Sequence, residues 1–382
     1  MGNFAVNECT EGRPGLINRF IVELSNECNL RCRYCHQNLP DFKEHRMSAS
    51  MLEKVIDFGL RHSIKQIDFT GAGETTFFAG WTSIFNRLLD QGISLIMTSN
   101  LARLFADDEI ETVARLAELS VSLDTIDRKI AKDLRGVDIR NIIYNVMKIR
   151  SFGIAHNVCI PNLIVSAVFT AEAVEGIEDL VAFAAANGFR VVNLQDLVVF
   201  KEIDNNAQSV WSLEGEKGLR AVRRTRKAFE IAEREGLMIR CQEGFLDRLS
   251  QFETQCLSGA STRNRRLKPV TNGHLETYAK TPGPGETRAC KDPWEFLQII
   301  GNGFVRPCCF RSVENIIFGQ LDENNSLDEI IASDTAREMR RSLLTGDLDA
   351  NCRICHWRKI IPVEEFQLEM REYLAQHQNV NR

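Results

Sequence analysis

Three cysteines lie close together near the start of the chain, at Cys28, Cys32 and Cys35. Three residues separate the first pair and two separate the second, so one short loop can carry all three thiolates. Three thiolates on one loop can bind three irons of a [4Fe–4S] cluster and leave the fourth iron open to a substrate or cosubstrate. The alternative is a structural zinc site, which usually has four ligands, and His36 is the nearest further candidate.

A second group of cysteines lies in the C-terminal part of the chain, at Cys290, Cys308, Cys352 and Cys355. Four thiolates saturate one [4Fe–4S] cluster, which is then suited to passing electrons or to holding the fold rather than to binding substrate. A four-cysteine zinc site satisfies the same ligand count. Cys309 is left over, and we expect it to pack nearby, with ligand exchange or hydrogen-atom donation as the alternative roles.

The first spacing resembles the CxxxCxΦC signature of the radical S-adenosylmethionine (radical SAM) superfamily, with Tyr34 in the aromatic position. The resemblance implies that SAM binds the open iron through its amino and carboxylate groups. One electron from the cluster then cleaves SAM to methionine and a 5′-deoxyadenosyl radical, which takes a hydrogen atom from a substrate C–H bond. A reducing partner such as flavodoxin or ferredoxin is implied as the source of that electron.

The C-terminal spacing resembles the opening of a SPASM domain, an auxiliary-cluster module of many radical SAM enzymes. The run from Cys290 to Cys308 fits this opening, including a β-hairpin turn expected at Asn302 and Gly303. A complete SPASM domain continues with further cysteines, but none follows Cys355 in this sequence. The shortened pattern resembles the twitch version of the domain, which implies one auxiliary [4Fe–4S] cluster held by the four C-terminal cysteines.

Segments typical of strands and helices alternate through the first two-thirds of the chain. Strands are expected at residues 20–24, 66–70, 94–99, 119–123, 157–168 and 190–196. Helices are expected at residues 49–61, 80–91, 107–117, 140–152, 173–187 and 214–235. This alternation predicts an α/β fold with parallel strands, either a partial barrel or a doubly wound sheet. The radical SAM resemblance implies a partial (β/α)6 TIM-like barrel followed by a small C-terminal α+β twitch/SPASM domain.

In either fold, ligands bind at the C-terminal ends of the strands, and a glycine-rich turn follows the second expected strand. The residues of this turn are Gly71, Ala72, Gly73 and Glu74. Glycines there let a ligand approach the backbone closely, and a carboxylate can accept hydrogen bonds from an ammonium group. The turn resembles the GGE motif of the family, which implies that it holds the amino group of SAM.

Polar residues also follow the third and fourth expected strands. Hydroxyl and carboxylate groups of Ser99, Ser122 and Asp124 can bind a ribose of the cofactor or can cap the following helices, and the resemblance favours ribose contacts for Ser122 and Asp124. Arg135 resembles the arginine of the family that pairs with the SAM carboxylate, and a surface salt bridge is the alternative. The remaining predicted cofactor contacts are Tyr34 and Val165 beside the adenine, and Gln195, with its neighbour Asp196, at the barrel mouth.

Composition indicates a soluble globular protein of 382 residues, 44% hydrophobic and 26% charged, with a formal net charge of -5. This charge predicts no binding to nucleic acid or to an anionic membrane. We find no run of about 18 apolar residues and no signal peptide, and we expect a cytoplasmic protein. The expected divisions are an N-terminal segment (1–19), a radical SAM core (20–241), a loop-rich linker or lid with a basic stretch (242–289), and the auxiliary-cluster domain (290–382).

Two enzymatic hypotheses and one structural hypothesis follow. The first is oxidation or epimerisation of a sugar or aminocyclitol, because a twitch domain with one saturated cluster resembles that of the aminocyclitol dehydrogenases. The second is crosslinking or epimerisation of a ribosomally made peptide, which is disfavoured because only 19 residues precede Phe20, too few for a leader-binding domain. The third, a non-catalytic iron–sulfur or zinc scaffold, has no use for the residues of a SAM pocket. The catalytic base and the substrate are not predicted.

Overall fold

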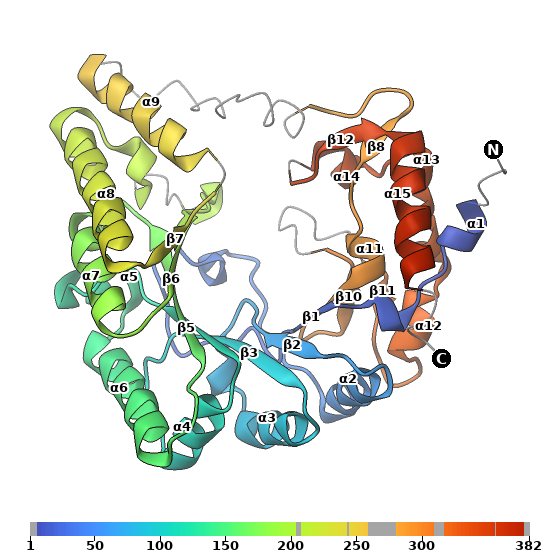
Figure 1. The fold of residues 1–382 in the computed structure, drawn as a ribbon, viewed down its shortest axis with the longest axis horizontal. Coiled ribbons are helices and arrows are strands. Elements are labelled where there is room, and N and C mark those ends of the chain that lie inside the picture. Colours follow the sequence, from blue (N-terminus) through green and yellow to red (C-terminus); the bar gives the residue numbers. More distant parts are fainter. Residues whose placement is uncertain are drawn as a thin grey trace.

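The computed structural model describes residues 6–203, 208–242, 244–258, 280–308, 317–355 and 357–377. Within these residues, one ten-stranded sheet runs in the order β11-β10-β9-β1-β2-β3-β4-β5-β6-β7. The sheet is strongly curved, and helices cover its outer face (Figure 1). This is the partial barrel that was predicted, and the α/β fold class is confirmed.

Strands β1 to β7 of the described chain are parallel to their neighbours in the sheet. Their bounds are β1 (Arg19–Val22), β2 (Gln66–Phe69), β3 (Ser94–Ser99), β4 (Glu118–Ser122), β5 (Asn162–Phe169), β6 (Val191–Asp196) and β7 (Met238–Arg240). Parallel neighbours need crossover connections, and helices supply them. These helices are α2 (Ala49–Arg61), α3 (Trp81–Asp90), α4 (Asp107–Ala114), α5 (Arg128–Arg135), α6 (Ile139–His156), α7 (Ile177–Ala186) and α8 (Gly215–Glu235).

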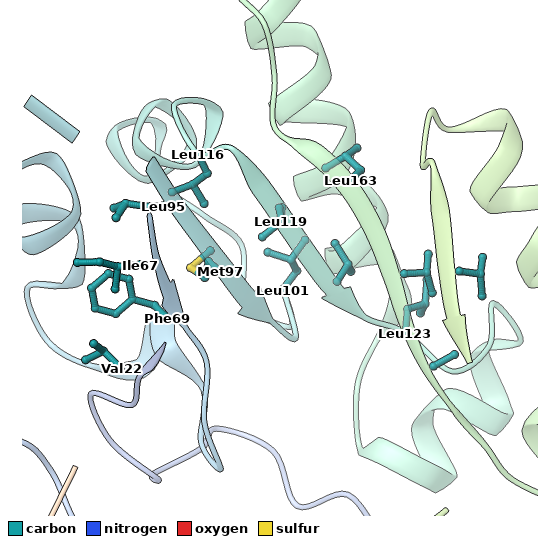
Figure 2. Packing of buried hydrophobic residues seen from close by; sticks show 14 of the residues in the cluster. Val22, Ile67, Phe69, Leu95, Met97, Leu101, Leu116, Leu119, Leu123 and Leu163 are labelled. Atoms are coloured by element: carbon teal, nitrogen blue, oxygen red, sulfur yellow. The ribbon is translucent and has the colours of Figure 1, made fainter. Parts of the chain in front are cut away.

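One face of each strand packs against the helices. Figure 2 shows Val22, Phe69, Met97, Leu119 and Leu163 projecting from successive strands into this layer. All five are almost completely buried and belong to one large hydrophobic cluster. Burial of each such side chain contributes roughly 1.5–3 kcal/mol, which fixes the register of the strands and therefore the positions of the residues at their ends.

The opposite face of the strands lines the inside of the barrel, here called the lumen, and on β4 and at the end of β6 its residues are polar. Successive residues of a strand point to opposite faces. On β4, Leu119 and Val121 are buried among the helices, whereas Glu118, Ser120 and Ser122 are half-buried and face the lumen. Pairing with β5 and β6 places Ser166 and Asn193 level with Ser122, so hydroxyl and amide groups form a row inside the barrel.

The structure changes three details of the prediction. The fifth strand begins at Asn162 instead of residue 157, because α6 continues to His156 and Asn157 closes it in the left-handed conformation. Strand β7 was not predicted. The expectation of a loop-rich segment is wrong for α9 (Phe245–Ser258), which packs against α8. The basic stretch at 262–268 lies outside the described residues.

The C-terminal domain is built onto the same sheet. Strand β9 (Phe296–Ile299) pairs in parallel with β1, and β10 (Phe304–Arg306) and β11 (Gly319–Gln320) continue the sheet in antiparallel fashion. Gly303, with φ of 88°, closes the β9–β10 hairpin at the predicted turn. A second small sheet pairs β8 (Glu286–Arg288) with β12 (Ile360–Pro362).

Helices complete this domain, and the N-terminal segment packs with it. The helices are α11 (Asp292–Glu295), α12 (Leu327–Ile331), α13 (Asp334–Thr345), α14 (Ala350–Ile354) and α15 (Val363–Gln376). Helix α1 (Val6–Cys9) lies against α13 and α15 (Figure 1). The backbone carbonyl of Cys9 accepts a hydrogen bond from the indole of buried Trp294. In the described part of the chain, no helix has the length and apolar character needed to cross a membrane.

Candidate active site

The loop that carries Cys28, Cys32 and Cys35 follows β1 at the C-terminal end of the barrel strands, and all three cysteines are partly buried. Burial raises the pKa of the Cys28 thiol, and burial raises that of Cys32 to about 11, with neighbouring thiolates contributing in both. The mutual electrostatic influence indicates that the thiols lie near one another. Metal binding must therefore displace protons from this loop, as it does in other thiolate sites.

Side chains hold the backbone of this loop. Asn26 donates to the carbonyl of Lys43 at 2.8 Å and accepts from the amide of His45 at 2.7 Å. Gln37 donates to the carbonyls of Asn26 and Ala72, at 2.8 and 2.9 Å. The loop is thus tied to itself and to the turn after β2, which fixes the path of the backbone between the cysteines.

The two glycines of the turn after β2 are required by the cysteine loop itself. A Cβ atom on Gly71 would lie 2.3 Å from the side chain of Glu23, and one on Gly73 would lie 2.4 Å from the carbonyl oxygen of Glu27. The amide of Glu74 donates to that same carbonyl at 2.9 Å. The glycines were predicted to let a ligand approach the backbone closely. On this side of the turn, Glu23 and Glu27 of the protein itself make that close approach.

The carboxylate of Glu74 is buried, and it joins the ends of β2 and β3. It accepts hydrogen bonds from the hydroxyl of Thr76 at 2.6 Å, the hydroxyl of Ser99 at 2.7 Å and the amide of Asn100 at 2.7 Å. Three of its four hydrogen bonds go to Oε1, and the amide of Asn100 donates to Oε2. Oε2 therefore accepts fewer hydrogen bonds than Oε1 and keeps the capacity to accept one more from a ligand. Glu74 and predicted Ser99 are thus brought together.

Asn100 was not among the predicted contacts, although it follows the strand end directly. Its side-chain amide donates to Asn29 at 2.8 Å and lies 3.8 Å from the sulfur of Cys28. The next residue, Leu101, has a φ of 47°, a backbone conformation that residues other than glycine rarely adopt. Buried Asn145 of α6 donates to the carbonyl of Leu101 at 3.1 Å and so holds this strained segment beside the cysteine loop.

Tyr34, Asp124 and Arg135 form a second junction at the barrel mouth. The hydroxyl of Tyr34 donates to Asp124 at 2.5 Å, and the guanidinium of Arg135 donates to the same carboxylate at 3.2 Å and to the Tyr34 oxygen at 3.3 Å. Burial raises the pKa of Tyr34 well above its usual range. Burial alone would lower the pKa of Arg135, but its interactions with Tyr34 and with the Asp124 carboxylate raise it, so the arginine stays charged. The salt bridge of Arg135 is buried rather than at the surface.

The remaining predicted contacts divide. Ser122 faces the lumen at the end of β4, and exposed Gln195 donates to neighbouring Ser166 at 3.4 Å. The prediction for Val165 is wrong: its side chain is completely buried among the helices, because the alternation along β5 places Ser166 and Val168, not Val165, on the lumen side.

Asp196, which was expected beside Gln195 at the mouth, has both carboxylate oxygens bonded to other side chains of the protein. It accepts from the indole of Trp211 at 3.0 Å and from Arg248 at 2.5 Å. The Arg248 guanidinium also stacks over the Trp211 ring at 4.1 Å. Gln195 is therefore the residue at the end of β6 whose amide is directed to solvent.

Glu23 was missed by sequence reasoning, and it connects three segments. Its carboxylate accepts from the amides of Ala72 at 2.5 Å and Gly301 at 3.3 Å, and it contacts the ring of His45 at 2.7 Å. Burial alone would raise its pKa, but the hydrogen bonds from His45 and Ala72 lower it overall. One buried anion thereby links the cysteine loop, the turn after β2 and the first hairpin of the C-terminal domain.

The four C-terminal cysteines line one hollow. Cys290, Cys308, Cys352 and Cys355 surround an empty volume of about 430 Å³, part of it open to solvent. Burial raises the pKa of Cys290 well above its usual range and that of Cys352 to about 12. Cys309 lies outside the described residues.

The donor set of the hollow fits a cluster. In the described part of the chain, no group of three or more His, Cys, Asp or Glu side chains is spaced to hold a single metal ion. The ligands of a [4Fe–4S] cluster bind different irons and therefore stand farther apart than the ligands of one zinc ion. Four cysteines around an open hollow therefore match a [4Fe–4S] cluster better than a single zinc ion.

The other described cysteines are placed differently. Cys9 and Cys256 are buried, and Cys159 is exposed before β5, at the end of the barrel away from the cysteine loop. Cys241 directly follows β7, at the same end of the barrel as the cysteine loop, and burial raises its pKa, with Asp196 contributing. Cys241 is thus the described spare cysteine nearest to the barrel mouth in the topology.

Comparison with known proteins agrees with this architecture. Residues 22–184 match the radical SAM superfamily, and residues 290–356 match the SPASM iron–sulfur cluster-binding domain. The chain belongs to the radical SAM superfamily and carries a C-terminal SPASM domain. It is a radical SAM enzyme whose cofactors are a [4Fe–4S] cluster with SAM and an auxiliary iron–sulfur cluster.

Two curated relatives are a probable GTP 3′,8-cyclase of Pyrococcus abyssi and a GTP 3′,8-cyclase of Campylobacter jejuni. The first is 33% identical over 128 residues, which cover 34% of this chain and 41% of the relative. The second is 34% identical over 131 residues, which cover 32% of this chain and 40% of the relative. The chain thus spans about two-fifths of the length of these relatives.

Two solved structures share the fold over most of the chain. Streptococcus suis SuiB bound to S-adenosylmethionine has a TM-score of 0.58 and 17% identity, covering 85% of this chain and 68% of SuiB. Native anSMEcpe with bound AdoMet and the Kp18Cys peptide has a TM-score of 0.54 and 14% identity, covering 94% and 97%. At these identities the likeness establishes the fold and not the substrate.

Proposed function

We propose that this enzyme oxidises a hydroxylated small molecule, a sugar or an aminocyclitol, by removing hydrogen from a carbinol carbon. The observation that carries the proposal is the closed set of four cysteines in a domain whose strand β9 pairs directly with β1. A saturated second centre is suited to accept an electron, and an oxidation releases one that a redox-neutral reaction does not.

The residues divide into two proposed binding sets. Cys28, Cys32 and Cys35 hold the first cluster, and Cys290, Cys308, Cys352 and Cys355 hold the second. Glu74 accepts from the amino group of SAM through its Oε2. When bound, these groups supply a hydrogen-abstracting 5′-deoxyadenosyl radical and an acceptor for the electron that the oxidation releases.

The junction at Tyr34 has a positioning role in this proposal. Asp124 and Arg135 neutralise each other in the buried pair, so the pair fixes Tyr34 of the cysteine loop against the end of β4. Ser122 and Gln195, which face the lumen or solvent, are then the proposed contacts for ribose or substrate hydroxyl groups.

The lumen favours a polar substrate. Ser120, Ser122, Ser166 and Asn193 present hydroxyl and amide groups on its inner face. These groups can form hydrogen bonds with the hydroxyls of a sugar, whereas an apolar lumen would leave the sugar hydroxyls without partners. Peptide modification is the second candidate, because two proteins of the same fold were solved with peptides, SuiB with the precursor peptide SuiA and anSMEcpe with the Kp18Cys peptide.

The test uses the double variant Cys352→Ala, Cys355→Ala, after iron analysis and circular dichroism show that it is folded and keeps the first cluster. We expect it to form 5′-deoxyadenosine but little oxidised product from a panel of aminocyclitols and amino sugars, whereas the wild type yields product two hydrogens lighter. Full product formation by the folded double variant would eliminate the electron-acceptor role. Product from a peptide panel alone would favour the second candidate.

Deuterated water separates oxidation from epimerisation. An epimerase returns a hydrogen atom from a thiol that exchanges with solvent, so its product gains one deuterium, while an oxidised product is lighter and gains none at that carbon. Cys241→Ala should leave an oxidation unchanged. Loss of turnover in that variant, with deuterium in the wild-type product, would identify an epimerase.

A further inference from the structure

We propose that Asp68 is the general base of the oxidation and takes the hydroxyl proton of the substrate while its carbinol carbon is oxidised. The inference rests on the proposed function, because the oxidation of an alcohol to a ketone must release this proton to an acceptor. It names a catalytic residue that the sequence alone did not identify, and it gives that role to a carboxylate outside both cysteine sets.

Asp68 lies inside the barrel, near the C-terminal end of β2. The next residue, Phe69, ends the strand and packs among the helices, so the side chain of Asp68 points the other way, into the lumen. Gly71, the first residue of the turn that carries Glu74, follows three residues later, a span of at most about 11 Å of chain. The carboxylate therefore lines the lumen a short distance from the turn that is proposed to hold SAM.

The carboxylate of Asp68 has an acceptor atom that the fold does not use. Its Oδ1 atom is buried and accepts no hydrogen bond among the described residues, although the residue as a whole is only half-buried. By contrast, the buried carboxylates of Glu23 and Glu74 each accept several hydrogen bonds from the protein. A buried acceptor without a donor costs stability, so a ligand that brings its own donor explains its presence, and a substrate hydroxyl is such a donor.

In the described part of the chain, two charged groups act on Asp68 from other strands, and neither is bonded to it. Glu118 of β4 lies two strands away at the same level, and its carboxylate accepts from Asn162 at 3.1 Å. Arg19 of β1 lies 3.6 Å from Asp292. Burial raises the pKa of Asp68 to about 7, with the charge of Glu118 adding to the rise and Arg19 opposing it. A base with such a pKa can both take up and release a proton at neutral pH.

The proposed step balances in atoms and electrons. The 5′-deoxyadenosyl radical takes the hydrogen atom of the carbinol carbon, so that this C–H bond breaks and a C–H bond of 5′-deoxyadenosine forms. Asp68 takes the hydroxyl proton, so that the O–H bond breaks and the carboxylate becomes a carboxylic acid. The electron left on the substrate goes to the auxiliary cluster, and the C–O bond becomes the C=O bond of the ketone. Asp68 then returns its proton to solvent.

The test uses an aminocyclitol or amino sugar that the wild type oxidises, labelled with deuterium at the carbinol carbon. Asp68→Asn keeps the volume of the side chain and removes the base. We expect it to form 5′-deoxyadenosine that carries the deuterium, while the ratio of oxidised product to 5′-deoxyadenosine falls by about 100-fold or more, because general base catalysis typically contributes that much. Asp68→Glu, which keeps a carboxylate, should recover part of the ratio.

The pH dependence of this ratio separates a base from a structural residue. In the wild type the ratio should rise with pH through about 7, as Asp68 loses its proton. Glu118→Gln removes the neighbouring negative charge and so lowers the pKa of Asp68, which should move the rise to lower pH. Exposed Asp57→Asn, which removes a salt bridge to Arg61 within α2, should change neither the ratio nor its pH dependence.

Thermal unfolding first shows which variants are folded. Asp68→Asn removes a buried acceptor that has no donor, so we expect it to fold. If it does not, the shift of the pH dependence in Glu118→Gln decides the question.

The outcomes are distinguishable. Equal ratios in the wild type and in folded Asp68→Asn would overturn the role of Asp68 and leave the proposed function intact. Loss of 5′-deoxyadenosine together with product would place Asp68 in substrate binding, which also overturns its role as the base. A wild type that forms no oxidised product would overturn the proposed function, and the assignment of the base with it.

Discussion

Cys28, Cys32 and Cys35 come from one continuous loop, whereas Cys290, Cys308, Cys352 and Cys355 come from separate segments of the C-terminal domain. The loop is positioned by backbone contacts to the ends of β1 and β2, and it offers three thiols at the mouth of the barrel. The hollow needs its whole domain to be folded before its four thiols meet. The local set leaves an iron open for chemistry, and the long-range set closes its cluster.

Removal of the local set is the strongest test of this comparison. The triple variant Cys28→Ala, Cys32→Ala, Cys35→Ala should lose about half of about eight irons and all formation of 5′-deoxyadenosine, because the closed cluster has no iron left for SAM. Iron analysis and chromatography of the nucleoside check this, with exposed Cys159→Ala as the control that changes neither. Residual 5′-deoxyadenosine in the triple variant would show that the two sets are assigned wrongly.

Substitution of Glu74 tests whether this carboxylate binds SAM in addition to stabilising the mouth of the barrel. Glu74→Ala should weaken SAM binding about 10- to 100-fold, since a hydrogen bond to a charged group is worth roughly 1.5–3 kcal/mol. It should also lower the melting temperature, because Ser99 and Thr76 lose a buried acceptor. Glu74→Gln keeps the volume and an acceptor, so it should lose SAM affinity with a smaller loss of stability. Normal SAM affinity in both variants would make Glu74 purely structural.

Glu23 tests whether the two regions depend on each other. Glu23→Gln removes the charge that His45 contacts and leaves an amide among donors at Ala72 and Gly301. We expect about 1–3 kcal/mol less stability and a several-fold loss of SAM affinity, because the turn after β2 loses its anchor. Exposed Glu44→Gln, which removes a salt bridge to Arg31 on the same loop, should do neither. Similar effects in both variants would argue against a specific link.

The sequence predicted what is local in this molecule. The spacing from Cys28 to Cys35 and the positions of strand ends depend on a few consecutive residues, and the six predicted strands all exist, with the start of the fifth placed too early. Strand β7 was missed because it has three residues, too few for an alternation pattern. Val165 was misplaced because its face of the strand depends on register, which one sequence segment does not contain.

The connections between distant segments could not be predicted. Glu23 meets Ala72 and Gly301 only after β1, β2 and β9 have paired, and neither the charge nor the spacing of Glu23 is unusual. Arg288 likewise reaches the four-cysteine hollow through the β8–β12 pairing. In both cases a charged residue next to a strand end was visible, but its partners were not.

Asp68 extends the comparison from the mouth to the lumen and carries the smallest expected effect on stability. Whereas both carboxylate oxygens of Glu74 accept hydrogen bonds, the Oδ1 atom of Asp68 is buried and accepts none among the described residues. Burial raises the pKa of Asp68 to about 7, with the charge of Glu118 contributing and Arg19 opposing. The alternation along β2 places Asp68 on the lumen side, level with Ile21 and Ile96.

The sign of the pH dependence follows from this raised pKa. An unfolded chain binds this proton with a pKa of about 3.9, so the folded state holds more protons between about pH 4 and 7, and stability falls as pH rises through that range.

Asp68→Asn removes the cost of ionisation, so it should raise the free energy of unfolding by on the order of 1–3 kcal/mol at pH 8 and by less at pH 5.5. Thermal unfolding at the two pH values measures the difference. Glu118→Gln is the control. Without the neighbouring charge of Glu118 the pKa of Asp68 falls, so part of the same gain in the free energy of unfolding should appear although Asp68 is still present. A gain independent of pH would mean that Asp68 is not the group whose ionisation the lumen opposes.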